Sequence, residues 1–133
     1  MPERRKAAQD AGLSKDRVVA EAMRLADREG VDGLSMRRLA AELGAGAMSL
    51  YYYVANKDEL IDAMIDVVFG EIELPAEGTD WQTAMRGRAM SAREVLARHP
   101  WAIALMESRT TPGPANLRHR EAVTACLRTA GFS

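Results

Sequence analysis

The residues best suited to bind another molecule are gathered between Ser35 and Lys57, a stretch that holds two arginines, a lysine and three consecutive tyrosines. A helix buries aromatic rings on one face only, so the run from Tyr51 to Tyr53 must direct at least one ring away from the core. Exposed tyrosine hydroxyls and lysine ammonium groups are typical contacts to phosphate oxygens. The stretch therefore predicts a helix–turn–helix whose second helix faces a phosphate backbone.

The helices that must position these side chains have clear start and stop signals. Ser35 is a favourable N-cap, because its hydroxyl can accept a backbone N–H of the first turn. Gly44 suits the left-handed residue that ends a helix, and a second, short helix is expected to begin near Ala47. The apolar face of the first helix, with the two arginines Arg37 and Arg38 off it, consists of Met36, Leu39, Ala40 and Leu43.

One longer helix is expected before this pair of short helices and another after it. Ser14 can cap one that runs to about residue 29. Asn56 can cap the other, with Glu59 at the third position of a capping box. We expect this second helix to end at Phe69, before Gly70. Its apolar arc is wider than one packing seam requires, so it should contact two neighbours.

The C-terminal half is also expected to be helical. Residues 71–79 contain Pro75 and Gly78 and form a linker or a frayed helix end. Asp80 can cap a long helix to about residue 98, and Pro100 suits the first position of a short helix. A last helix is expected from about Ala115. The predicted apolar stripe of the long helix is Trp81, Met85, Ala89, Ala92 and Leu96. No strand pattern or repeat is present, so we predict an all-α chain.

Composition is that of an ordinary soluble globular protein, with 133 residues, 47% hydrophobic and 28% charged. The 18 basic and 19 acidic residues give a net charge of −1, and bulk charge does not indicate a nucleic-acid binder. The basic cluster Arg4–Lys6 is either a solvated tail or an arm that touches phosphate. No apolar run suits a membrane span or a signal peptide, and there is one cysteine. We therefore expect a cytoplasmic location and no membrane partner.

The sequence predicts no enzyme. His99 precedes a proline at a helix break and His119 is expected on a polar face, and neither has a cysteine, serine or carboxylate at a catalytic spacing. Cys126 falls on the apolar side of its helix and is expected to be an inert core thiol. We find no metal-ligand spacing and no glycine-rich phosphate loop, so no catalytic residue, metal or cofactor is predicted.

Three segments combine these signals in one order: GLSMRRLAAELG at 33–44, SLYYYV at 49–54 and NKDEL at 56–60. They strongly resemble the TetR family of bacterial transcriptional regulators. The resemblance extends over the first helix and, more loosely, through the pairs at 80–81 and 113–114 and the segment RHPW at 98–101. These look like the tetracycline-repressor-type regulatory half of that family.

The resemblance implies an N-terminal three-helix helix–turn–helix head followed by a helical-bundle regulatory domain. We expect a flexible basic tail at 1–13, a DNA-binding domain at 14–59, a connecting helix and linker at 60–79, and part of a ligand-binding and dimerisation domain at 80–133. It also implies a homodimer on a palindromic double-stranded DNA operator. Family members have further helices that form most of the dimer interface. We therefore expect this chain to be truncated, which puts its own dimerisation and operator binding in question.

The resemblance also assigns roles in the head. Arg37 is positioned like the base-reading arginine of the family, and the alternative is a solvated surface arginine. Short or apolar side chains at 47–49 favour close approach and contact with a thymine methyl group. Tyr51 is the tyrosine expected to pack partly into the head, and Tyr53 stands where most relatives have His. The expected base contacts are Arg37, Ala47, Met48 and Ser49, and the expected phosphate contacts are Ser35, Tyr51, Tyr52, Tyr53 and Lys57.

In the regulatory half, an apolar pocket between helices is expected to bind a small-molecule effector. Its candidate residues are Met64, Val68, Met85, Arg88, Met106 and Arg109, with the two arginines available to a polar or acidic group. Ordinary core packing is the alternative for the apolar ones. Met106 lies near where tetracycline-binding members have a metal-ligating His, so a magnesium–tetracycline effector is not predicted.

Together these expectations describe a DNA-binding transcriptional repressor that a small molecule releases. Coupling would run through the helix from residue 56 to residue 69, whose tilt sets the separation of the two heads. The alternative is a helical ligand-binding or interaction protein that does not bind an operator in this truncated form.

Overall fold

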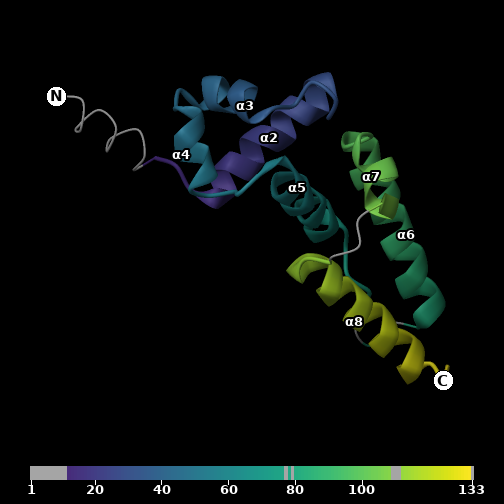
Figure 1. Ribbon diagram of the computed structural model, residues 1–133. Helices are drawn as coiled ribbons and strands as arrows, with labels where there is room; N and C mark the ends of the chain where they lie inside the picture. Colours follow the sequence, from purple (N-terminus) through teal and green to yellow (C-terminus); the bar gives the residue numbers. More distant parts are fainter. Residues whose placement is uncertain (1–11, 77, 79, 109–111, 133) are drawn as a thin grey trace. The chain divides into compact units, whose positions relative to one another are not determined.

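The computed structural model describes residues 12–76, 78, 80–108 and 112–132, and every regular element in that part of the chain is a helix (Figure 1). The predicted all-α class is therefore confirmed. The basic cluster at residues 4–6 and Arg109 lie outside the described residues. The helices are α2 (Lys15–Glu29), α3 (Met36–Leu43), α4 (Ala47–Tyr51), α5 (Lys57–Glu71), α6 (Trp81–Arg98), α7 (Ala102–Ser108) and α8 (Pro114–Thr129).

The chain divides into two compact units, Met1–Met64 and Ile65–Ser133, and the boundary falls inside α5. The first unit contains α2, α3, α4 and the start of α5, whereas the second contains the end of α5 with α6, α7 and α8. None of the helices in the described ranges is long and apolar enough to cross a membrane.

The first unit has a core of aliphatic side chains contributed by each of its helices. Ser14 caps α2 by accepting the backbone N–H of Arg17 at 3.1 Å, and α2 ends at Gly30 as predicted. Leu34, in the connector before α3, is also buried. The largest fully buried side chains of the unit are Val18, Leu25, Leu39, Leu50, Val54, Leu60 and Met64.

The predicted turn between α3 and α4 is confirmed. Ser35 accepts the N–H of Arg38 at 3.0 Å, which caps α3. Gly44 has φ +66°, a left-handed value that only glycine adopts at little cost. The N–H groups of Gly44 and Ala45 then bond the carbonyls of Ala41 and Ala40, which closes the helix end in a Schellman arrangement.

The start of α5 follows the prediction with one change. Asn56 Oδ1 accepts the N–H of Glu59 at 2.8 Å, but the Glu59 carboxylate accepts from Ala55, one residue before the cap, at 3.2 Å. The end differs more, because α5 continues through Gly70 to Glu71. A Cβ placed on Gly70 would lie 3.7 Å from the Ala115 Cβ, an ordinary contact distance, so α8 packs beside this end of α5.

In the second unit, Asp80 caps α6 as predicted, accepting the N–H groups of Gln82 and Thr83 at 3.0 and 3.1 Å. The predicted apolar stripe is shifted, because Ala84 and Val95 are the buried residues of α6 and Ala89 is exposed. Ser91, seven residues after Ala84 and four before Val95, lies on the same face of α6, and its Oγ accepts the N–H of Glu73 at 2.8 Å.

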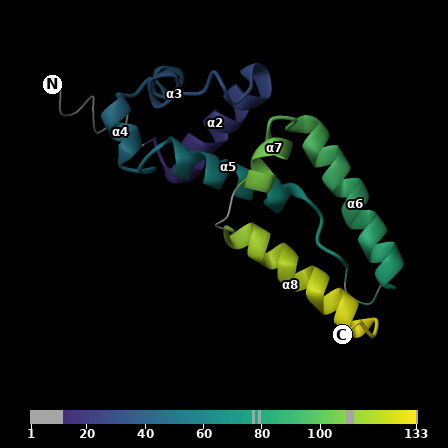
Figure 2. The same ribbon diagram turned by 45° about the vertical axis from the view of Figure 1, so that its right-hand side comes forward.

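The two later helices begin slightly differently from the prediction. Helix α7 begins at Ala102 rather than at Pro100, and α8 begins with Pro114 rather than at Ala115. The start of α6 and the end of α8 lie side by side (Figure 2), where the rings of Trp81 and Phe132 pack edge to face with centroids 5.1 Å apart.

Candidate functional site

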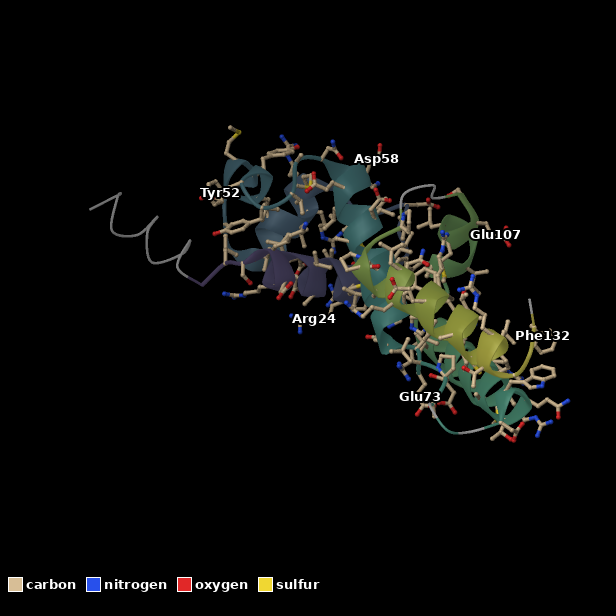
Figure 3. The ribbon with its side chains drawn as sticks, turned by 90° about the horizontal axis from the view of Figure 1, so that it is seen from below. Arg24, Tyr52, Asp58, Glu73, Glu107 and Phe132 are labelled. Atoms are coloured by element: carbon tan, nitrogen blue, oxygen red, sulfur yellow. The ribbon has the colours of Figure 1, made fainter. Side chains whose placement is uncertain are left out.

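Helix α4 is anchored by one buried side chain, whereas two of its other side chains and the residue that follows it are exposed. Leu50 is fully buried, whereas Tyr52 is 86% exposed, Met48 82% and Tyr51 46%. Figure 3 shows Tyr52 at the outer edge of the first unit. Exposing such large apolar side chains on a short, anchored helix is unfavourable in water, so this face is suited to cover another molecule.

The three tyrosines differ in environment. Tyr53, and not Tyr51 as predicted, is the least exposed of the three. Its ring packs edge to face against Tyr52, with centroids 5.2 Å apart and an interplanar angle of 82°. The reason is helical geometry: α4 ends at Tyr51, and the turn that follows carries Tyr53 back towards the core beside buried Val54.

The two neighbouring arginines of α3 have different surroundings. Arg38 lies between two carboxylates, with Nη2 at 2.6 Å from Glu29 and Nε at 3.5 Å from Glu42. The hydrogen bond and charge of Glu29 raise the pKa of Arg38. Arg37 is exposed and forms no hydrogen bond or ion pair with any residue that the structure describes. Only Arg37 therefore keeps its guanidinium group available.

The remaining candidates for DNA contact lie in the same unit. Ala47, Ser49 and Lys57 are half-buried, at the starts of α4 and α5. The hydroxyl of Ser35 accepts the cap hydrogen bond and still has its own proton to donate. The structure thus brings all nine predicted DNA-contact residues into one unit, on the starts of α3 and α5 and along α4 with the turn after it.

The six predicted effector residues are less well gathered. Met64 belongs to the first unit, whereas Val68, Met85, Arg88 and Met106 belong to the second. Met64 and Val68 are fully buried, and the other three are half-buried. Arg88 Nε is buried and has no hydrogen-bond partner among the residues that the structure describes.

A groove that the sequence did not predict lies in the second unit and has a volume of about 710 Å³. It is formed by the segment before α6, by Trp81 at the start of α6, and by the last turns of α8 with Cys126. Cys126 is therefore half-buried in a groove wall, and not in the core as predicted. The described lining includes none of the six predicted effector residues. The groove could have been recognised from the apolar residues in and beside the predicted linker, which are Leu74, Pro75 and Trp81.

Both histidines are buried, and the predicted polar environment of His119 is wrong. His119 Nε2 donates to the carbonyl oxygen of Phe69 at 2.6 Å. His99 Nε2 lies 2.7 Å from Glu71 Oε2, and Arg98 lies 3.8 Å from the same oxygen. Helical periodicity placed His119 among charged neighbours, but it could not reveal that the carbonyl oxygen of Phe69, which also accepts the N–H of Ile72 at 3.2 Å, lies within its reach.

The same end of α5 also caps α8. Asp66 accepts the N–H groups of Ala115 and Asn116 at 3.0 and 3.1 Å, at a helix start where Gly113 has no side chain to do so. Sequence reasoning missed this role because Asp66 and Ala115 are far apart in the chain. The described part of the chain holds no cluster of three or more potential metal ligands.

Comparison with known proteins agrees with this architecture. Residues 18–64 match the model of "Bacterial regulatory proteins, tetR family", and residues 74–133 match "Tetracyclin repressor-like, C-terminal domain". An HTH-type transcriptional regulator of Saccharopolyspora erythraea is 46% identical over 121 residues, which are 90% of this chain and 51% of the relative. The HTH-type transcriptional repressor DrrR1 of Streptomyces coeruleorubidus is 44% identical over 123 residues, 91% of this chain and 46% of the relative.

Solved structures give the same result. ActR of Streptomyces coelicolor in complex with actinorhodin superposes with a TM-score of 0.83 at 37% identity, covering 91% of this chain and 58% of that one. BioQ in complex with its double-stranded DNA operator superposes with a TM-score of 0.72 at 28% identity, covering 91% and 74%. This chain spans about half the length of the two curated relatives. With both family models matched in order along a helix–turn–helix unit and a helical second unit, the chain belongs to the TetR family of bacterial transcriptional regulators.

Proposed function

We propose that this chain binds an operator as a transcriptional repressor that a small molecule releases. The observation that supports this most directly is α4, whose buried Leu50 anchors a helix with Met48 and Tyr52 almost fully exposed. A recognition helix must be held rigidly while its side chains remain free to enter the major groove. Since operators lie on chromosomal DNA, this function places the protein in the cytoplasm.

Each exposed group has a role in this proposal. Arg37, which has no partner among the described residues, reads a guanine edge, whereas Arg38 stabilises the packing of α3 against α2. Residues 47–49 approach the base edges. The hydroxyls of Ser35 and of the three tyrosines, with the Lys57 ammonium group, bind phosphate and fix the register.

Operator binding in this proposal needs two copies. Recognition helices that read a palindrome must lie about 34–36 Å apart, which requires a rigid dimer. The domain at 14–59 supplies the reading head, and residues 80–133 supply part of the dimerisation and effector-binding domain. Because the chain spans about half of its curated relatives, dimerisation by this chain is itself part of the proposal.

The effector is proposed to bind in the second unit and to act through α5. The chain carries the candidate residues Val68, Met85, Arg88 and Met106 there, with Met64 and Arg109 as further candidates. The relative ActR has been crystallised with actinorhodin, which supports an effector-binding half of this kind. Helix α5 is continuous from the first unit to the second, so residues 60–79 are the connection through which binding alters the head.

A mobility-shift experiment tests the proposal. The protein is incubated at low salt with duplexes covering the DNA that flanks its own gene, and its mass in solution is measured in parallel. We expect a shifted band that an unrelated duplex does not compete away, and an affinity that falls with salt. A dimer that shifts none of the duplexes would contradict operator binding and favour a helical ligand-binding protein.

A further inference from the structure

Four charged side chains form a network between the end of α2 and α3. Arg38 Nη2 lies 2.6 Å from Glu29 Oε1, and Arg38 Nε lies 3.5 Å from Glu42 Oε1. The same Glu42 oxygen lies 3.9 Å from Nη2 of Arg28. All four side chains remain partly exposed, between 33% and 58%, so the network lies at the surface and not in the core.

The Arg38 side chain begins close to the groups that are proposed to contact DNA. Arg38 follows Arg37 directly, and it lies three residues after Ser35, on the same side of α3. Its backbone N–H donates to the Ser35 hydroxyl oxygen at 3.0 Å. A guanidinium group released on this side of α3 would therefore be available to the phosphate that Ser35 is proposed to contact.

Glu29 and Glu42 are placed to hold Arg38 and do little for the helices that carry them. Glu29 is the last residue of α2, where the helix dipole disfavours a carboxylate. Glu42 follows Arg38 by four positions, and this order of charges is the less favourable one for an ion pair along a helix. The clearest effect of the two carboxylates is therefore to neutralise an arginine beside the proposed DNA contacts.

The described part of the first unit carries more acidic than basic residues. Residues 12–64 include seven basic and nine acidic side chains. Binding to DNA of any sequence depends on the number of phosphate charges that basic side chains neutralise. Each arginine that a carboxylate holds therefore lowers the affinity for operator and unrelated DNA alike.

We propose that Arg38 is a latent phosphate-binding residue, and that Glu29 and Glu42 hold it away from DNA. The inference rests on the proposed operator binding and concerns the sequence-independent part of the affinity. With Arg38 held back, the base contacts that distinguish the operator account for a larger share of the binding free energy. Removal of both carboxylates releases Arg38 to a phosphate in each half-site.

The experiment compares the wild type with Glu29→Gln/Glu42→Gln, in which each side chain keeps its size but loses its charge. Affinity is measured at several salt concentrations for a duplex that the wild type selects from a random library and for an unrelated duplex. One new phosphate contact in each of two half-sites should steepen the slope of log affinity against log salt concentration by about 1.8 for both duplexes. The affinity ratio of double variant to wild type should therefore fall about twelvefold for each fourfold rise in salt.

Two further variants identify the group responsible. Addition of Arg38→Ala to the double variant should return the slope to the wild-type value. Glu21→Gln is the matched control, because Glu21 forms an ion pair of 2.8 Å with Arg24, which lies apart from Tyr52 (Figure 3). This control also removes an acidic charge and releases an arginine of the same unit, yet it should keep the wild-type slope.

Exposed ion pairs contribute little to stability, so the melting temperatures of these variants should stay close to that of the wild type. If the double variant does not fold, Glu29→Gln alone is the test, since it breaks the 2.6 Å pair and should steepen the slope in the same direction.

Three results would overturn the inference: a wild-type slope in the variant that lacks the carboxylates, a steeper slope that persists after Arg38→Ala is added, or an equal steepening by Glu21→Gln. A wild-type protein that selects no duplex would instead contradict the proposed function itself, so the two failures are distinguishable.

Discussion

Asp66 lies against Gly113 so closely that a Cβ on Gly113 would be 2.5 Å from Asp66 Cγ. This contact lets the Asp66 carboxylate reach the first turn of α8, where it accepts the N–H groups of Ala115 and Asn116. A carboxylate at the positive end of a helix is also favoured by the helix dipole. One residue of α5 thus fixes where α8 begins.

The first prediction concerns this contact. Gly113→Ala should lower the free energy of unfolding by about 1–3 kcal/mol, because the new methyl group overlaps the Asp66 carboxylate. Urea denaturation measures the change. Gly87→Ala is the control, since Gly87 lies within α6 with open space around it and alanine there should stabilise by about 0.5–1 kcal/mol. Equal stability of Gly113→Ala and wild type would show that the contact is not as close as the structure has it.

The second prediction separates the two arginines of α3. Arg37→Ala should relax base preference at one operator position by about 1–3 kcal/mol, because a guanidinium that reads a guanine edge is removed. Arg38→Ala should leave that preference unchanged, because Arg38 is paired with Glu29 and Glu42. Binding to a panel of single-base operator variants measures both effects. The reverse assignment of the two phenotypes would refute the proposed role of Arg37.

The third prediction concerns salt. Lys57→Ala should weaken binding to all duplexes and reduce the slope of log affinity against log salt concentration by about 1.8, the loss of one phosphate contact in each of the two half-sites. Titrations at several potassium chloride concentrations give the slope. Lys15→Ala, at the exposed start of α2, is the control and should keep the wild-type slope. An unaltered slope for Lys57→Ala would count against a phosphate contact.

The fourth prediction concerns acid. Hydrogen bonds from Thr83, followed by the one from Gln82, lower the pKa of Asp80 below its ordinary value. A lowered pKa in the folded state means that the ionised carboxylate favours folding. This stabilisation is complete above the ordinary pKa and is lost as the pH falls through the lowered one. Asp80→Asn should therefore lose less stability than the wild type over that acidic range. Urea midpoints measured at several pH values give the two profiles. Parallel profiles for the variant and the wild type would contradict the prediction.

The helix starts illustrate what local chemistry determines. Ser14, Ser35, Asn56 and Asp80 were each predicted as caps, and each side chain accepts a backbone N–H of the turn it begins. A cap bonds a residue two or three positions away, so its signal is complete within a few residues. The family resemblance and the all-α class rest on the same short-range patterns.

Contacts between distant residues were not predictable in this way. His119 was expected among polar surroundings, yet it is buried and donates to Phe69, 50 positions away. The inward face of α6 was also misplaced, and it includes Ser91, which bonds Glu73 across 18 positions. Periodicity identifies which residues share a face, but it does not identify the groups that face them.

The sequence by itself determined that this protein is helical, where most of its helices begin, and that its tyrosine run and neighbouring basic residues gather between Ser35 and Lys57. Those properties depend on capping, turn formation and hydrophobic spacing, which act over a few residues. Only the tertiary structure decided that Arg37 rather than Arg38 is free, that Met48 is exposed while Tyr53 is partly covered, and that Asp66 caps α8. Each of these properties depends on the carboxylate, ring or backbone N–H that another segment of the chain brings within reach. Which groups meet in this way is decided only when the chain folds.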